Sequence, residues 1–139
     1  MRTSSILLCL VFSIFAIISV VNGISCENPS QYAGRSLCDP FGGYCGECVS
    51  LVKVCTGDRR TIHQWRPGTR VRGANIASGT AIATFPNGKY RGHAAIYISQ
   101  DKNGIQVWDQ WKGHPVSRRT IRWNGSGLSN NGDSFYVIN

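Results

Sequence analysis

The chain has 139 residues, so we expect a single domain. Its 15 Lys and Arg side chains against 7 Asp and Glu give a formal net charge of +8 at pH 7, which favours polyanionic partners without identifying one. No apolar run after residue 23 is long enough to span a bilayer, which excludes an integral membrane protein once the first segment is removed.

Residues 1–23 have the order of a secretory signal peptide: Arg2, an apolar run over 6–21, and small residues near Gly23, where we expect cleavage. The alternative is an uncleaved anchor helix, for which the run is short. Cleavage leaves residues 24–139 as one domain with a formal charge of about +7. We therefore expect a secreted, extracellular monomer. The bacterial envelope is its most accessible polyanion, and no nucleic acid partner is expected.

The cysteines that follow the predicted signal are odd in number. They are Cys26, Cys38, Cys45, Cys48 and Cys55. In an oxidising compartment cysteines tend to pair, so this count predicts two disulfides and one free thiol. If Cys48 is the free thiol, the other four allow three pairings, and the sequence does not choose among them.

The glycine-containing residues 42–47 lead into a predicted helix over residues 48–55, with Leu51 and Val52 on its apolar face and Gly57 as a stop signal. Cys48 opens this helix. The unpaired N–H groups and the positive dipole end of a helix stabilise a thiolate, so we expect a nucleophile there. The competing interpretation is that Cys48 is another disulfide partner.

Antiparallel strands are predicted downstream, with the last but one at an edge because its arginines alternate with apolar residues. The ranges are 79–85, 93–100, 105–111, 117–123 and 135–138. If Gln100 faces Ile105 across the loop 101–104, Ile96 lies opposite Asp109. His93 and Asp109 then lie near one another, and a twist or a bulge is needed to aim both at one edge.

The order Cys48, His93, Asp109 supplies a nucleophile, a base and a group that orients the base, as cysteine acyl transfer requires. Tyr44 is a candidate hydrogen-bond donor to an oxyanion, and Gln110 is the alternative to Asp109.

Two further features concern modification and metals. Asn124-Gly125-Ser126 is a glycosylation sequon, usable in a eukaryotic host. Cys45 and Cys48 have the spacing of half a zinc site but lack a second pair, so no metal and no cofactor are expected. One N-terminal helix that carries the thiol and packs on four or five antiparallel strands is an α+β fold.

The chain resembles the papain-like superfamily, and within it the small NlpC-type and CHAP amidases, which include effectors that bacteria inject into rivals. Gly46-Glu47-Cys48-Val49 is similar to the Gly-Gln-Cys-Val-like nucleophile segment, with Glu47 in place of Gln. Gly92-His93-Ala94-Ala95-Ile96 is similar to the strand that carries the base, and Asp109 falls where the family has its third polar residue.

The resemblance implies a cysteine peptidase or amidase that cleaves amide bonds in the peptide part of bacterial peptidoglycan. The alternative is a non-catalytic, disulfide-stabilised basic protein that binds envelope glycans or anionic surfaces through its four Trp side chains. A reactive thiol at Cys48 distinguishes the enzyme from the binding protein.

Overall fold

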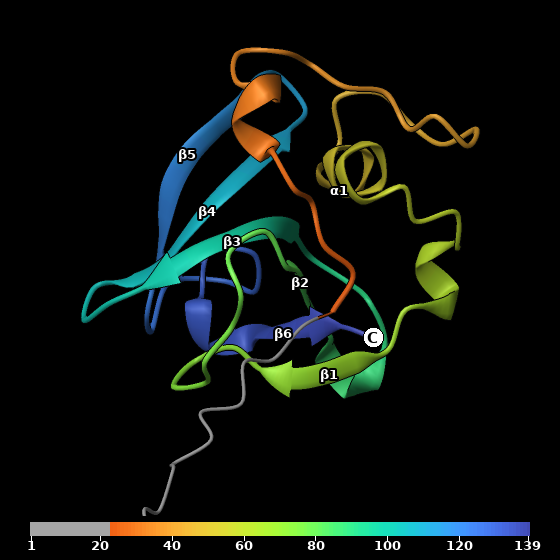
Figure 1. Cartoon of the computed structure of the whole chain (residues 1–139). Helices are drawn as coiled ribbons and strands as arrows, with labels where there is room; N and C mark the ends of the chain where they lie inside the picture. Colours follow the sequence, from red (N-terminus) through yellow and green to blue (C-terminus); the bar gives the residue numbers. More distant parts are fainter. Residues whose placement is uncertain (1–22) are drawn as a thin grey trace, which may run out of the picture.

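A computed structural model describes residues 23–139, so the predicted signal peptide lies outside the described residues except for Gly23. The described part is an α+β fold in which one α-helix packs on a six-stranded antiparallel sheet (Figure 1). The elements are α1 (Cys48–Thr56), β1 (Pro67–Arg70), β2 (Ala81–Thr84), β3 (Ala94–Gln100), β4 (Gly104–Trp111), β5 (His114–Arg122) and β6 (Phe135–Ile138). Four short 3-10 helices, η1 (Pro29–Tyr32), η2 (Ile62–Gln64), η3 (Pro86–Gly88) and η4 (Gly132–Ser134), join them.

Helix α1 begins at Cys48, as predicted from the sequence, and continues one residue beyond the predicted end. Gly57 ends it with φ of 72°, a left-handed conformation that glycine adopts without a steric penalty. Leu51 and Val52 are fully buried on the side that faces β3 and β4. Packing of this apolar face, rather than the propensity of nine residues, therefore holds the helix in place.

The sheet order is β1-β6-β2-β3-β4-β5, which corrects the predicted four or five strands to six. The missed strand, β1, contains Pro67 and Gly68, residue types that are typical of loops. It lies at one edge of the sheet, where a proline is tolerated because only one side needs ladder hydrogen bonds. The predicted edge strand, β5, does lie at the opposite edge.

A bulge in the β3–β4 pair decides which residues meet near the site. Gln100 pairs with Ile105, as assumed from the sequence, but the register shifts between Tyr97 and Ser99. Ile96 therefore pairs with Trp108, and the prediction that it faces Asp109 is wrong by one residue. Since side chains alternate between faces, this shift moves Asp109 to the face of the sheet on which the side chain of His93 lies.

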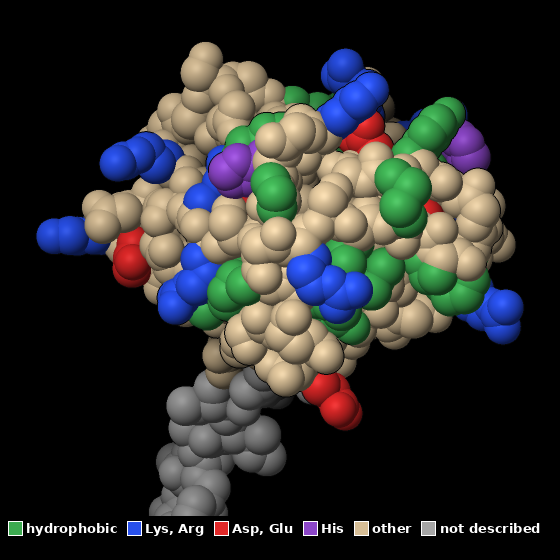
Figure 2. Space-filling view, turned by 90° about the horizontal axis from the view of Figure 1, so that it is seen from above, with side chains coloured by type: hydrophobic (Ala, Val, Ile, Leu, Met, Phe, Trp, Pro, Cys, Tyr) green, Lys and Arg blue, Asp and Glu red, His purple; other side chains and the backbone are tan. Residues whose placement is uncertain are grey.

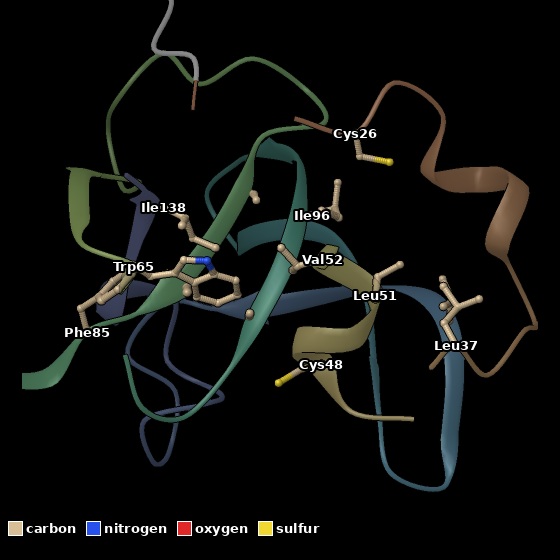
Figure 3. Close-up of a cluster of buried hydrophobic side chains, with 13 residues drawn as sticks. Cys26, Leu37, Cys48, Leu51, Val52, Trp65, Phe85, Ile96 and Ile138 are labelled. Atoms are coloured by element: carbon tan, nitrogen blue, oxygen red, sulfur yellow. The ribbon is translucent and has the colours of Figure 1, made fainter. Parts of the chain in front are cut away.

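Each face of the sheet has its own apolar cluster. The cluster under α1 includes Leu51, Val52, Trp65, Phe85 and Ile96, and Cys48 lies at its border (Figure 3). The cluster on the other face includes Val71, Ile82, Val107, Ile121 and Phe135. The end of the sheet next to the start of α1 is consequently supported from both sides, which gives a rigid frame for polar groups.

Two disulfides hold the segments around α1. Cys26 pairs with Cys55, which ties the start of the described chain to the last turn of α1. Cys38 pairs with Cys45 and closes a short loop just before the helix. Disulfides form and persist in oxidising compartments, so this pairing indicates an exported protein.

The basic side chains do not form one continuous patch on the face seen from above in Figure 2. Lys and Arg stand there in separate groups, with uncharged surface and apolar side chains between them. Among residues 23–139, no helix has both the length and the apolar character to cross a membrane.

Candidate active site

Cys48 is the free thiol of the described residues and is 8% exposed at the start of α1. Its Sγ lies 3.4 Å from the hydroxyl of Tyr90. The preceding residue, Glu47, has an extended conformation, and its side chain forms no capping hydrogen bond with the first N–H groups of the helix.

The surroundings of Cys48 favour its thiolate. Burial raises the pKa of the thiol, but a hydrogen bond with His93 and the charge of the imidazolium lower it, and so do hydrogen bonds from Tyr90 and from the backbone N–H of Ala94. The net effect is a pKa below the usual value of 9.0. The thiol therefore ionises more readily than an ordinary cysteine.

His93 lies just before β3 and is bonded to Asp109 on β4. Its Nε2 lies 2.7 Å from Oδ2 of Asp109, and both side chains are buried. Because Nε2 faces the carboxylate, Nδ1 is the ring nitrogen left for the sulfur of Cys48. The structure thus brings together all three residues predicted as nucleophile, base and orienting group.

The imidazole of His93 is held in its charged form. Burial lowers its pKa, but hydrogen bonds to Asp109 and Cys48, with the negative charges of both groups, raise it to about 9. A lowered thiol pKa and a raised imidazole pKa both favour the thiolate–imidazolium form of this pair over the neutral form.

Tyr90 is a site residue that the sequence analysis missed. Its ring makes edge contacts with Trp65 and Phe85, which fix the hydroxyl against the sulfur of Cys48. Burial and the charge of the Cys48 thiolate raise the pKa of Tyr90, so the phenol remains a hydrogen-bond donor at neutral pH. The one feature of the sequence that could have indicated Tyr90 is its position three residues before the predicted base, His93.

Arg119 was also missed, although β5 was expected to carry arginines. Its Nε donates to Oδ2 of Asp109 at 2.6 Å, and its guanidinium lies 5.1 Å from the ring centre of Trp111. Asp109 pairs with Ser117 across β4 and β5, which makes Arg119 the diagonal neighbour on the same face. His93 and Arg119 thus both bond Oδ2 of the buried carboxylate, whereas its Oδ1 has no partner among the described residues.

Two predicted secondary residues have other positions. Tyr44 lines the cleft beside Cys48, but its side chain is 81% exposed and the phenol in contact with the sulfur is that of Tyr90. Gln110 is fully buried and bonds the backbone of Leu37 and Glu47. Because its amide is fully engaged there, Gln110 positions the segment before α1 and is not a substitute for Asp109.

Asn124, the candidate glycosylation site, is exposed in the turn after β5. Cys45 is engaged with Cys38, so it is not available to form a metal site with Cys48. Within residues 23–139 no group of three or more His, Cys, Asp and Glu side chains has the arrangement of a metal centre.

A groove runs past Cys48 in two directions. On one side lies the Tyr90 cleft, of about 660 Å³, lined by residues that include Cys48, Val49, Ile62, His63 and Tyr90. It shares Ile62, His63 and Tyr90 with a further hollow of about 430 Å³. On the other side lies the Arg119 cavity, of about 380 Å³, lined by residues that include Cys48, His93, Trp111, Arg119 and Asn130.

Known proteins resemble this chain along most of its length. The profile of the family "Domesticated amidase effector 2" matches residues 15–138. A protein of that name from Ixodes scapularis is 42% identical over 132 residues, which are 90% of this chain and 91% of the relative. The "Type VI secretion amidase effector 2 protein" of Salmonella typhi is 38% identical over 114 residues, covering 66% of this chain and 84% of the relative.

The fold has a solved counterpart. The structure of "Type 6 secretion amidase effector 2" superposes with a TM-score of 0.67 at 31% identity, covering 82% of this chain and 92% of that one.

These relatives and the solved structure are named as amidase effectors, which defines the class of this protein as an enzyme, an amidase. The chain belongs to the Domesticated amidase effector 2 family.

Proposed function

We propose that this protein is a secreted cysteine amidase that hydrolyses amide bonds in the peptide part of bacterial peptidoglycan. One observation carries the proposal: the free thiol of Cys48 lines the same cavity as His93, which is bonded to the buried Asp109, in a chain of an amidase family. Cys48 is the nucleophile, His93 the general acid and base, and Asp109 the group that orients the imidazole.

In the first half of the reaction, the Cys48 thiolate adds to the carbonyl carbon of the amide. A C–S bond forms, and the C–N bond breaks as Nδ1 of His93 gives its proton to the leaving nitrogen. In the second half, the neutral imidazole takes a proton from water, which attacks the thioester. The products are a free amine and a free carboxylate, and the thiolate is restored.

The charge that develops on the carbonyl oxygen needs donors beside the sulfur. The backbone N–H of Cys48, at the start of α1, is one. The Tyr90 hydroxyl, 3.4 Å from Sγ, is the second donor we propose, in place of Tyr44. Neither donor has to move when the substrate binds, because α1 and the aromatic contacts of Tyr90 hold both in place.

We further propose the papain-like arrangement of the NlpC-type and CHAP amidases for this fold. The supporting observation is the order of a helix-borne thiol, a His at the start of a strand and an Asp at the end of the next strand. Export by a signal peptide cleaved near Gly23 is consistent with the two disulfides. A monomer that acts without a cofactor remains part of this proposal.

The proposal is tested by digesting purified sacculi with the wild-type protein and with Cys48→Ala, followed by mass spectrometry of the released fragments. We expect the wild type to release fragments with new amino and carboxyl ends, and the variant to release none. Thermal unfolding of both proteins establishes that the variant is folded. Fragment release by Cys48→Ala at the wild-type rate would rule the mechanism out.

A further inference from the structure

The two arms of the groove are chemically different at the catalytic residues. Cys48 lines both arms, Tyr90 lines only the Tyr90 cleft, and His93 lines only the Arg119 cavity. The hydrogen-bond donor to the sulfur and the proton donor to the leaving group therefore line different hollows that meet at Cys48.

If the proposed function holds, this difference fixes how the scissile amide is oriented between the Tyr90 cleft and the Arg119 cavity. His93 must reach the nitrogen of the scissile bond to protonate it, so this nitrogen points toward the Arg119 cavity. The carbonyl oxygen must point to the donors beside α1 and Tyr90. The acyl part then lies in the Tyr90 cleft, and the amine that leaves lies in the Arg119 cavity.

The Arg119 cavity offers a cation to this leaving group. The Arg119 side chain is 23% exposed, with Nε bonded to Asp109 and Nη1 bonded to Asn130 at 3.3 Å. Trp111, which is 40% exposed, covers the guanidinium on one side and fixes its plane. Nη2 has no hydrogen-bond partner among the described residues, and Arg119 lines the cavity, so in-plane N–H groups of this immobilised guanidinium are available to a ligand there.

The acidic side chain that faces the same cavity is that of Glu47. It lines the Tyr90 cleft as well, so it lies at the boundary of the two arms, beside the scissile bond. Arg119 lines the Arg119 cavity and not the Tyr90 cleft. On the leaving-group side of the scissile bond, the wall of the Arg119 cavity therefore carries the positive charge of Arg119. A carboxylate on the substrate is the group that such a guanidinium binds best.

We infer that the Arg119 cavity is the subsite for the leaving amine and that Arg119 recognises a free carboxylate on that leaving group. The substrate class is thus narrower than amides in general: the amine that departs belongs to an amino acid whose own carboxylate is not amidated. Arg119 is a specificity residue in addition to its bond with Asp109. This inference rests on the proposed function.

The test uses sacculi in two forms, untreated and with their carboxylates converted to carboxamides by carbodiimide and ammonia. We expect wild-type protein to release fragments from the amidated form about tenfold more slowly, the size expected for loss of one charge-assisted hydrogen bond. Arg119→Gln should be slow on both forms, with a rate ratio near one. Arg122→Gln, with the same loss of charge on the same strand but outside the groove, should keep the wild-type ratio.

The outcomes separate the two levels of the proposal. Equal wild-type rates on both forms, or an unchanged ratio in Arg119→Gln, overturn the inference and leave the amidase function standing. No release from untreated sacculi overturns the proposed function itself. If Arg119→Gln is inactive because Asp109 is disturbed, Arg119→Lys decides: the ratio is kept if the charge recognises a carboxylate, and a ratio near one overturns the inference.

Discussion

At the scale of single residues, three hydrogen-bonded neighbours set the reactivity of Cys48. Burial of a thiol opposes its ionisation, and here that cost is exceeded by His93, Tyr90 and the backbone N–H of Ala94. Cys48 is therefore buried and still ionises more readily than an ordinary cysteine. The contribution of each neighbour to the thiol pKa can be tested separately.

The pH dependence of activity follows from the two opposed pKa shifts. The thiol pKa lies below 9.0, so the thiolate persists to lower pH than in a free cysteine. The His93 pKa is raised to about 9, so the imidazolium that protonates the leaving amine is lost as the pH rises through that value. We expect a bell-shaped rate profile with its alkaline limb near pH 9, measured by fragment release. A profile that keeps rising above pH 10 would contradict this assignment.

Tyr90→Phe removes the hydroxyl beside the sulfur and retains the ring that packs on Trp65 and Phe85. We expect a higher thiol pKa, measured by the pH dependence of alkylation of Cys48, and a rate about 100- to 1,000-fold lower, the size expected for loss of one oxyanion donor. Tyr44→Phe is the matched control and should leave both quantities unchanged, since its phenol is exposed. The reverse result would restore Tyr44 as the donor.

At the scale of elements, β4 positions the start of α1 through Gln110. Its amide accepts from the N–H of Leu37 and donates to the carbonyls of Leu37 and Glu47, so a strand side chain holds the segment that carries Cys48. The bulge in β3 and the diagonal placement of Arg119 complete the site from the other side.

Gln110→Ala should destabilise the protein by about 3 kcal/mol, because three backbone groups lose a buried partner. Gln106→Ala is the control on the same strand: Gln106 is half-buried and accepts one bond from Thr120, so we expect a change of about 0.5 to 1 kcal/mol. Chemical denaturation gives both values. Equal losses in the two variants would show that Gln110 has no special role in holding the segment before α1.

At the scale of the whole molecule, the two disulfides differ in what they restrain. The Cys26–Cys55 bridge closes a separation of 29 residues, and the Cys38–Cys45 bridge closes one of 7, in the loop that leads into Cys48. The longer closure removes more entropy from the unfolded chain and so stabilises the fold more, whereas the shorter bridge lies next to Cys48.

Removing the long bridge by changing Cys26 and Cys55 to Ser should lower stability by about 3 to 4 kcal/mol, and removing the short bridge by about 2 kcal/mol. For the rate of fragment release we expect the opposite order, with the larger loss in the Cys38, Cys45 double variant. Thermal unfolding and sacculus digestion of both double variants measure the two quantities. The same order in both would contradict this division of roles.

The sequence by itself determined the elements and most of their chemistry. Local sequence rules were sufficient to predict α1 and five of the six strands. A helix stop at Gly57 and the alternation of apolar residues depend only on residues that are close together in the chain. The odd cysteine count indicated a free thiol, and the order of Cys48, His93 and Asp109 predicted the groups that we propose react.

Only the tertiary structure decided how these groups meet. The bulge between Tyr97 and Ser99 shifts the register by one residue, and the disulfide pairing selects one of three arrangements. Tyr90 and Arg119 join the site from other elements, and β1 forms because β6 offers it an edge. These are long-range contacts, whose free energy depends on residues distant in the chain, so no local pattern in the sequence records them.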